Sequence, residues 1–413
     1  MRIVSGTAAM VKVRKTAARG SQYAEVEPVV RRIVADVRRH GDDTLRKYAS
    51  RWDGLRLQES IRVSEDEIQE AWKFAAPELK ASMRTAAANI RRFCEWQKPA
   101  EWVRTRHGIT VGQIIRPLDS VGCYVPGGRY PLISTLLMTV IPAQVARVPN
   151  IRVVSPRPAA EVLAAAGMLG VHEVYRIGGA QAIAALAYGT ESVPRVQKIV
   201  GPGNLYVAAA KKLVSFDCAI DFLAGPTEVV IISDAGTPEF IAADLVAQAE
   251  HDPEALAVFI TTRDDLARLV ARAAEKLSRR NEIARQSLRR NGMILVSGSR
   301  RQSFEWANEL AAEHVTVDSA DVDLVHNAGS IFVGDYSPQA AGDYASGPNH
   351  VLPTGGAARF RGGLSVVDFV KLISVQRLSR PGLRQIAPVV ESLAKAEGLR
   401  AHAESIRARF NHA

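Results

Sequence analysis

The stretch IRVVSPRPAAEVLAAAGMLGVHEVYRIGGAQAIAALAYG, Ile151 to Gly189, alternates between two local patterns. IRVVS and EVYRIG are short apolar runs that predict strands, and each is followed by a helix-like segment, AEVLAAAGML or AQAIAALAYG. Strands that alternate with helices indicate a parallel, doubly wound sheet with helices on its faces. The stretch therefore predicts an α/β protein.

The same alternation continues on both sides of this stretch. TVGQIIRPL and SVGCYV predict strands before it, and KIVG followed by LYVAAAKKLV adds a strand and a helix after it. A second series begins with the strand TEVVIISD, Thr227 to Asp234. Its further elements are a helix that ends at His251, the strand ALAVFITT, a long basic helix from about Asp264 to Arg290, the strand MILVSG, the helix QSFEWANELAAEH and the strand SIFVG. The chain thus holds two α/β series in tandem.

Helical patterns occupy both ends of the chain. From Tyr23 to about Trp96, apolar residues recur at spacings of three and four, and SEDE at Ser64 to Glu67 is a capping-box signature. Beyond about Ser365, SVVDFVKLISVQRL, QIAPVVESLAKAEGL and AHAESIRARF predict a small helical appendage. It is short for an independent core, so it needs the body of the protein or a partner subunit to pack on.

These patterns predict four parts. Residues 21–122 and 228–364 form one α/β domain, in which the second series shares a core with the N-terminal helices, and residues 123–227 form the other. Residues 1–20 are an N-terminal segment, and residues 365–413 are the helical tail.

The composition narrows the class of protein. The chain has 413 residues, of which 47% are hydrophobic and 23% are charged, as in a globular protein with more than one core. It contains no apolar run of about 18 residues, and its start lacks the apolar block of a signal peptide, so we expect a cytoplasmic protein with no membrane partner. The three cysteines, Cys94, Cys123 and Cys218, are too few and too irregularly spaced for a disulfide framework or a thiolate metal site.

The formal net charge of +10 raises the alternative of a nucleic-acid-binding protein. The arginines, however, are spread along amphipathic helices such as VVRRIVADVRRH, and aromatic residues make up only 6% of the chain. We therefore interpret most of the charge as solvated helix faces that attract small anions, and we expect no nucleic-acid partner.

Three glycine turns follow predicted strands: YVPGG, RIGGAQ and IVGPGN. Glycine permits positive φ, and a turn before a helix can offer free N–H groups to phosphates. None of the turns is G-x-G-x-x-G or a P-loop, and each alone is an ordinary strand-to-helix turn. Three on one predicted sheet edge favour a ligand crevice.

Four of the nine histidines lie beside acidic or amide residues, which suits either a metal site of mixed nitrogen and oxygen ligands or an acid/base cluster. Gln248 and His251 are three residues apart and project from one face of a helix, although a polar helix end in water is the plainer interpretation. The four histidines and their companions are His251, His314, His350 and His402, with Gln248, Glu313, Asp343 and Glu397.

Eight motifs together resemble the histidinol dehydrogenase family, and they cover the chain from about Gly122 to its end in the family's order. They are SVGCYVPGGRYPL, IGGAQAIAALAYGT, VQKIVGPGNLYVAAAKK, AGPTEVVIISD, AQAEHDPEA, NELAAEHV, GDYASGPNHVLPTGGAARF and EGLRAHAESI.

The resemblance implies a zinc-dependent enzyme that oxidises L-histidinol to L-histidine with two NAD, through an aldehyde-level intermediate, at the last step of histidine biosynthesis. It also implies two incomplete Rossmann-like domains of the aldehyde-dehydrogenase kind, with NAD on the side of residues 123–227. The family forms a domain-swapped homodimer in which the C-terminal tail reaches the partner subunit.

The resemblance also implies roles for single residues. His314 matches the general base, and Glu313 matches the group that activates water. The implied zinc ligands are Gln248, His251, Asp343 and His402 of the partner subunit, and these residues also contact substrate. The implied substrate contacts further include Thr227, His314, Glu397 and, less directly, His350, and the implied NAD contacts are Tyr124, Gln181 and Asn204.

The chain departs from the family pattern at two positions. DFLAGPTE stands where many relatives read DMPAGPSE, so Thr227 keeps a hydroxyl but adds a methyl group, and Gln339 stands where relatives often carry glutamate.

Two alternatives remain beside histidinol oxidation. One is a paralogue that oxidises another small alcohol such as sulfopropanediol, against which Glu397 argues because a carboxylate repels a sulfonate. The other is a thiohemiacetal mechanism at Cys123 or Cys218, neither of which lies in a suitable cysteine motif.

Overall fold

The computed structural model describes residues 1–19, 23–56, 58–127 and 131–411 and divides the chain into two units. The first unit comprises Met1–Gln97 and Leu118–Phe369, and the second comprises Lys98–Pro117 and Val370–Ala413. Gly128, which belongs to the predicted turn YVPGG, lies outside the described residues. Within the described part of the chain, no helix is both long and apolar enough to cross a bilayer.

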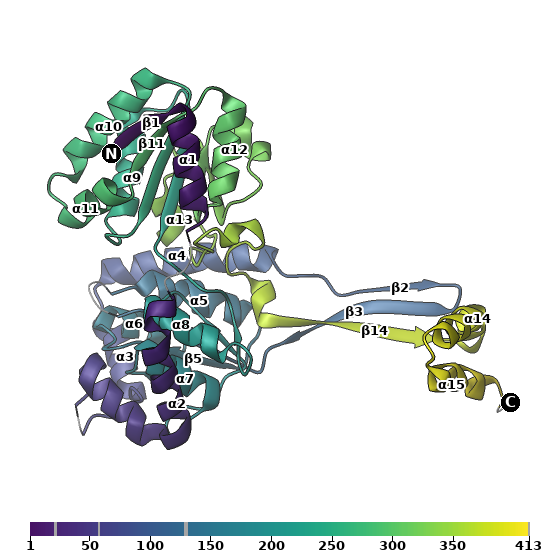
Figure 1. Ribbon diagram of the computed structural model, residues 1–413. Helices are drawn as coiled ribbons and strands as arrows, with labels where there is room; N and C mark the ends of the chain where they lie inside the picture. The colour runs from purple at the N-terminus through teal and green to yellow at the C-terminus, as the bar shows by residue number, and fades with distance from the viewer. Residues whose placement is uncertain (20–22, 57, 128–130, 412–413) are drawn as a thin grey trace. The chain divides into compact units, whose positions relative to one another are not determined.

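The first unit holds two parallel sheets, as the alternating sequence predicts (Figure 1). One has five strands in the order β6-β5-β4-β7-β8, so the chain starts in the middle and reverses direction between β4 and β7. Its strands are β4 (Ser120–Tyr124), β5 (Asn150–Val154), β6 (Glu173–Tyr175), β7 (Lys198–Val200) and β8 (Ala219–Ile220). The helices between them are α5 (Ile133–Val145), α6 (Ala160–Met168), α7 (Gly179–Tyr188) and α8 (Leu205–Val214).

The other sheet has six parallel strands in the order β1-β11-β10-β9-β12-β13, and it reverses direction between β9 and β12. Its strands are β1 (Arg2–Ser5), β9 (Glu228–Ile232), β10 (Leu256–Thr261), β11 (Met293–Val296), β12 (His314–Val317) and β13 (Ser330–Val333). The helices of this part are α1 (Gly6–Ala17), α9 (Pro238–Ala249), α10 (Asp264–Ser278), α11 (Glu282–Arg290), α12 (Arg300–Leu310) and α13 (Gln339–Tyr344). Separate apolar cores fill its two faces.

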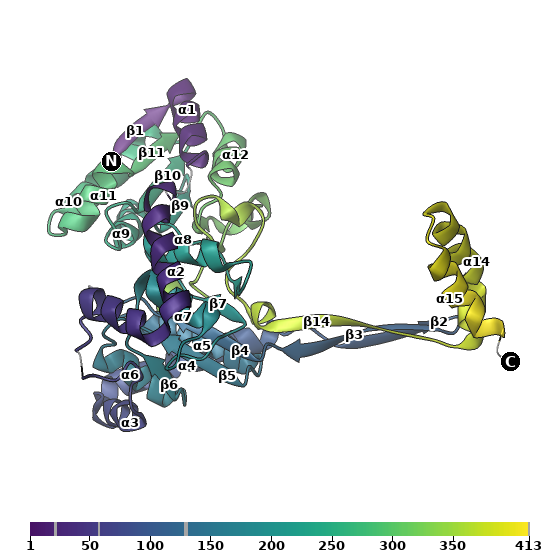
Figure 2. The same cartoon turned by 60° about the horizontal axis from the view of Figure 1, so that its bottom comes forward.

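The N-terminal helices do not share a core with residues 228–364, contrary to our expectation. Helix α2 (Tyr23–Tyr48) packs on α7 and α8, α3 (Glu65–Phe74) packs on α6, and α4 (Pro77–Trp96) packs on α5 (Figures 1 and 2). The reason is that α7 and α8 are apolar almost all round and need cover on their outer faces, which the apolar stripe of α2 provides. The expected N-terminal segment is not separate either, because β1 pairs with β11 and α1 packs on α12.

Two local predictions in the six-stranded part were wrong. The long basic helix is two helices, because Asn281 ends the first run and accepts the N–H of Ala284 as the cap of α11. AAEH does not continue α12: Ala311 is left-handed and ends the helix at Leu310, and His314 opens strand β12. The β-branched residues of HVTV favour that strand. The capping box at Ser64 and Glu67 is confirmed.

The second unit is a three-stranded antiparallel sheet followed by two helices. Strands β2 (Trp102–Arg106), β3 (Ile109–Pro117) and β14 (Val370–Leu378) lie in the order β14-β3-β2, and β3 and β14 form a long ribbon that ends near α14 (Arg380–Ala396) and α15 (Arg400–Asn411) (Figure 2). We expected residues 365–413 to be helical throughout, but VKLISVQRL pairs with β3 along its whole length. Non-local pairing overrides the local helical pattern here.

Short helical turns complete the fold. They are the π-helical turn η1 (Ala49–Asp53) and the 3₁₀ turns η2 (Ser319–Leu324), η3 (Ala357–Arg359) and η4 (Val366–Phe369).

Candidate functional site

The amino ends of β9 and β12 bring together four of the predicted site residues. Thr227 directly precedes β9, while Glu313 precedes β12 and His314 is its first residue. The two strands are parallel neighbours in which His314 pairs with Val229, so these residues meet at one edge of the sheet. Helix α9 returns from the opposite edge because β10 is parallel to β9, and it delivers Gln248 near its C-terminal end.

A chain of hydrogen bonds orients Glu313. The amide of Gln248 donates to Thr227 Oγ1, and Thr227 Oγ1 donates in turn to Glu313 Oε2 at 2.5 Å. The same carboxylate oxygen accepts the backbone N–H of Glu228 at 2.9 Å. Gln248 and Glu313 are both buried. The additional methyl group of Thr227 leaves this use of its hydroxyl intact.

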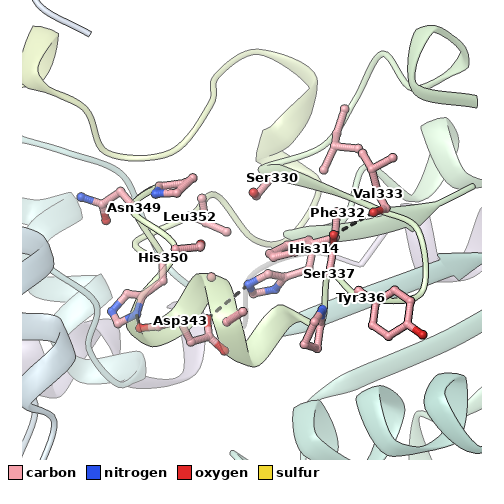
Figure 3. Close-up of a pocket in the computed structure, with 16 residues that line it drawn as sticks. His314, Ser330, Phe332, Val333, Tyr336, Ser337, Asp343, Asn349, His350 and Leu352 are labelled. Carbon is pink, nitrogen blue, oxygen red and sulfur yellow. Dashed lines mark hydrogen bonds and ion pairs between the residues drawn. The ribbon is translucent and has the colours of Figure 1, made fainter. Parts of the chain in front are cut away.

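The ring of His314 is held with its Nε2 free. Nδ1 lies 3.1 Å from the backbone oxygen of Glu228 and 3.4 Å from Gln248 Nε2, so a proton on Nδ1 is donated to that oxygen. Among the described residues, Nε2 has no hydrogen-bond partner, although it is buried. It faces Asp343 Oδ1 at 3.6 Å, as the dashed line in Figure 3 indicates. Nε2 is therefore the nitrogen available to a substrate.

Asp343 comes from α13, which follows β13. His350, in the loop after α13, donates its Nδ1–H to the backbone oxygen of Asp343 at 2.8 Å and thereby ties the loop to the helix. Figure 3 shows His314, Asp343 and His350 around one cavity.

Charge and burial perturb these three groups in different directions. Burial lowers the pKa of His314, but the carboxylates of Glu313 and Asp343 outweigh burial and raise it to about 10. Burial raises the pKa of Asp343, yet the hydrogen bond and charge of His314 lower it overall. Burial lowers the pKa of His350 despite the nearby Asp343. The site thus holds an ion pair between His314 and two carboxylates beside a neutral imidazole.

The cavity beside these residues has a volume of about 320 Å³, which suits a small polar molecule. The lining combines polar groups with Phe332, whose ring packs against His314 at a centroid distance of 5.7 Å. Its polar lining residues are His314, Ser330, Tyr336, Ser337, Asp343, Ser346, Asn349 and His350.

The predicted metal ligands of one chain are only partly clustered. His251 follows α9 and is exposed, and its charge contributes to the lowered pKa of Asp343. Within the described ranges, no three His, Cys, Asp or Glu side chains are arranged to hold a metal ion. Three donor groups nevertheless come from neighbouring elements. The buried amide of Gln248 lies on α9, the imidazole of His251 lies on the turn after α9, and the carboxylate of Asp343 lies on α13, which contacts α9. This donor set fits a nitrogen and oxygen site that still lacks a ligand.

The three predicted NAD contacts lie at the carboxyl edge of the five-stranded sheet. Tyr124 ends β4, Gln181 is in the first turn of α7, and Asn204 caps α8. Gly201 has a φ of 112°, and a Cβ there would lie 2.2 Å from the backbone oxygen of Tyr124, so only glycine brings these two turns together.

The N–H groups of the RIGGAQ turn are not free, contrary to the expectation from its glycines. Gly178 N–H donates to Asp53 Oδ2 at 2.9 Å, and Gly179 N–H donates to the hydroxyl of Tyr124 at 3.0 Å. Gln181 Nε2 also donates to Asp53 Oδ2, at 3.0 Å. Asp53 is buried and its pKa is raised by burial. The sequence analysis missed this residue, whose signal was an acidic residue before glycine at the end of a helix.

Glu228 is a second buried acid that the sequence analysis missed. Its Oε1 pairs with Arg19 at 2.5 Å and accepts the backbone N–H of Gly355 at 3.0 Å. An acidic residue at the start of an apolar strand, EVVII, was the available signal.

The remaining predicted site residues belong to the second unit. Glu397 caps the C-terminus of α14, and His402 lies in the first turn of α15. Both side chains are exposed.

The cysteines do not supply a reactive thiolate. All three are buried, and burial raises the pKa of Cys123 to about 12 and of Cys218 to about 11. A thiol that stays protonated is a poor nucleophile, which argues against a thiohemiacetal mechanism.

Comparison with known proteins agrees with the motifs over nearly the whole chain. The family model described as histidinol dehydrogenase matches residues 16–410. The chain is 49% identical over 393 residues to the histidinol dehydrogenase of Methanothermobacter thermautotrophicus, with 92% of both chains covered. It is 45% identical over 410 residues to that of Geobacter sulfurreducens, with 95% of both covered. The crystal structure of histidinol dehydrogenase from Elizabethkingia anophelis matches 100% of this chain and 98% of its own, with a TM-score of 0.94 at 35% identity. The chain therefore belongs to the histidinol dehydrogenase family, whose members are oxidoreductases of histidine biosynthesis.

Proposed function

We propose that this chain is a zinc-dependent L-histidinol dehydrogenase. It oxidises L-histidinol to L-histidine with two NAD, by way of histidinaldehyde, at the last step of histidine biosynthesis. The observation that carries this proposal is a small cavity lined by His314 and Asp343, with the buried carboxylate of Glu313 3.5 Å from His314 Nδ1, in a chain of this family.

Zinc would be held by Gln248, His251, Asp343 and His402 of the partner subunit. When bound, zinc supplies a positive centre that orients the imidazole and amine of histidinol. The two oxygens and one nitrogen from a single chain leave room for the partner's ligand.

His314 takes the proton of the substrate hydroxyl at Nε2. The contact from Nδ1 to the backbone oxygen of Glu228 fixes the tautomer and leaves the Nε2 lone pair toward the cavity. A base must be neutral, whereas two carboxylates raise the pKa of His314 to about 10. A cation held at Asp343 would offset one of these two carboxylate charges and so lower the pKa of the imidazole toward the range in which it can act as a base.

Glu313 orients and deprotonates water for attack on histidinaldehyde. Its Oε2 is already held by Thr227 and by the N–H of Glu228, so the carboxylate is fixed in place. Thr227 thereby acts through Glu313 and also lies beside the substrate.

NAD would bind at the five-stranded sheet, through Tyr124, Gln181 and Asn204, and it supplies the hydride acceptor. Both sheets reverse direction once, as in incomplete Rossmann-like domains, and the NAD side lies at such a reversal, between β4 and β7. The N–H groups of Gly178 and Gly179 are engaged within the protein, so this turn's backbone is not free to bind the phosphates of the cofactor.

The second unit would form the domain-swapped contact of a homodimer and deliver Glu397 and His402 to the partner's site. Apolar side chains are exposed along its ribbon and on α14, and such a surface indicates a protein partner. They include Leu372, Ile373, Val375, Val389 and Leu393, of which the last two are 58% and 59% exposed.

A paralogous dehydrogenase of another small alcohol, such as sulfopropanediol, is not favoured. The curated relatives that span more than nine-tenths of the chain at 45–49% identity are named histidinol dehydrogenases. Glu397 also suits the cationic amine of histidinol.

The proposal is tested by NADH formation from L-histidinol before and after treatment with a chelator. We expect activity that the chelator removes and added zinc restores. Activity with another small alcohol but none with L-histidinol would reject the substrate, and full activity in the chelated protein would reject the metal.

A further inference from the structure

Helix α13 carries Asp343, and a buried glutamine joins the other end of this helix to strand β12. Gln339 is the first residue of α13, is only 3% exposed, and donates from Nε2 to Thr316 Oγ1 at 2.5 Å. Gln339 and Asp343 are four residues apart and lie on one face of the helix. Thr316 and His314 are two residues apart and lie on one face of the strand. The helix therefore meets the strand through two parallel contacts, Gln339 with Thr316 and Asp343 with His314.

Close packing supports the same arrangement. A Cβ at Gly342 would lie 2.7 Å from Cε1 of Phe332, so the helix backbone rests directly on this ring. Phe332 also packs against the ring of His314. A small movement of α13 would consequently change the position of Asp343 relative to His314.

The amide of Gln339 is not explained by packing alone. Its Oε1 is buried and has no hydrogen-bond partner in the part of the chain that the structure describes. An unsatisfied buried acceptor destabilises a protein, and an apolar side chain of the same size would avoid it. The amide, unlike an apolar side chain, makes the hydrogen bond from Nε2 to Thr316 Oγ1.

We propose that Gln339 is a positioning residue, which with Thr316 anchors α13 on β12 and so keeps the Asp343 carboxylate within reach of His314 and of the bound zinc. The effect of this anchor on zinc and substrate binding rests on the function proposed above. The contact between Gln339 and Thr316 does not depend on that function. Glutamate at this position can keep the contact by accepting the hydroxyl proton of Thr316.

The kinetic test compares Gln339→Leu, Thr316→Val, the double variant and Gln339→Glu. Loss of one positioning hydrogen bond predicts that Gln339→Leu raises the KM for L-histidinol and the apparent Kd for zinc about tenfold each. The KM for NAD stays unchanged, because the proposed NAD contacts lie on the other sheet. Thr316→Val has the same effect, the double variant is no worse than either single variant, and Gln339→Glu stays within about threefold of wild type.

A matched control is Gln144→Leu. Gln144 lies on α5, donates from Nε2 to the backbone oxygen of Leu169 at 2.6 Å and accepts from Arg91 at 2.7 Å, so the substitution removes side-chain hydrogen bonds outside the site. It should lower thermal stability without changing the KM for L-histidinol or zinc affinity. Equal effects of Gln144→Leu and Gln339→Leu on these two constants, or additive effects of Gln339→Leu and Thr316→Val, would overturn the proposal.

Hydrogen exchange of the backbone amides of residues 339–344 tests the anchoring without any turnover. We expect faster exchange in Gln339→Leu and in Thr316→Val, and wild-type exchange in Gln144→Leu. Unchanged exchange in the first two variants overturns the proposal even in a fully active enzyme. Faster exchange in a protein that does not oxidise L-histidinol would instead uphold the anchor and reject the proposed function.

Discussion

At the residue scale, the site depends on a hydroxyl that both accepts and donates. Thr227 Oγ1 accepts from the amide of Gln248 and donates to Glu313, so one small group connects the proposed zinc ligand to the proposed water-activating carboxylate. The sequence drew attention to Thr227 as an implied substrate contact and as a departure from the family pattern. The two hydrogen bonds of Thr227 show that its hydroxyl takes part in the site despite the added methyl group.

Two substitutions separate the hydroxyl of Thr227 from its methyl group. Thr227→Ser keeps the hydrogen bonds and should leave kcat/KM for L-histidinol within about threefold. Thr227→Val keeps the size but removes the hydroxyl that joins the Gln248 amide to Glu313, which costs about 1–3 kcal/mol and lowers kcat/KM about 10- to 100-fold. Steady-state kinetics with L-histidinol measure both. Equal kinetics for the two variants would refute the role of the hydroxyl.

The assignment of His314 as base also makes a residue-scale prediction. His314→Gln removes the proton acceptor at Nε2 and should lower kcat about 10²- to 10⁴-fold, because general-base catalysis contributes that much. His172→Gln is the control, since His172 is exposed. Stopped-flow measurement of NADH formation distinguishes a slow chemical step from slow product release. A loss of less than tenfold would show that another group takes the proton.

At the scale of elements, the site is made where secondary structure ends or begins. The left-handed Ala311 ends α12, and the chain then enters β12 at His314, which orients Glu313 and His314 toward one edge. Adjacent residues at a strand entry can therefore act in one site, whereas on a helix they would diverge by about 100°. The sequence pattern predicted a helix that continues to His314, so strand β12 was not predicted.

Gly342 provides an element-scale prediction. Gly342→Ala would place a methyl group 2.7 Å from Phe332, so it should displace α13 and cost about 1–3 kcal/mol of stability as well as zinc affinity. Gly362→Ala is the control, because no atom lies within 4 Å of its Cβ position. Denaturant unfolding and zinc titration check the result. A Gly342→Ala protein with wild-type zinc affinity would contradict close packing of α13.

The limits of sequence analysis also follow from particular elements. Strands β4 to β7 and helices α6 to α8 were predicted because apolar runs of strand and helix type alternate there between turn residues, whereas helix α5 was not predicted. Strand β14 was missed because its structure depends on pairing with β3, which is more than 250 residues away in sequence. The wrong partner for α2 arose because periodicity identifies an apolar face but not the surface that covers it.

The candidate site, like the fold, was predicted in part from the sequence. The motif resemblance named Thr227, Gln248, Glu313, His314 and Asp343, and the structure brings these residues of the first unit together. Asp53 and Glu228 were missed because their partners, Gln181 and Arg19, become neighbours only in the folded chain. Local sequence can mark an acidic residue as unusual but does not identify its partner.

At the scale of the whole molecule, the proposed zinc site needs two chains. One chain would supply Gln248, His251 and Asp343, and the fourth ligand would be His402 of the partner subunit. Complementation between two inactive variants tests this directly. Heterodimers of a His314→Gln chain and a His402→Ala chain, isolated with two different tags, contain one site with both changes and one site with neither, so they should have about half the wild-type activity. Inactive heterodimers would place His402 in its own chain's site.

The central claim is that this chain carries out both oxidations of L-histidinol. The most direct measurement counts the NADH formed per L-histidinol consumed by the zinc-loaded protein and identifies the product. We predict two NADH per L-histidinol and L-histidine as the product. One NADH per substrate with accumulating aldehyde, or no turnover of L-histidinol, would contradict the account.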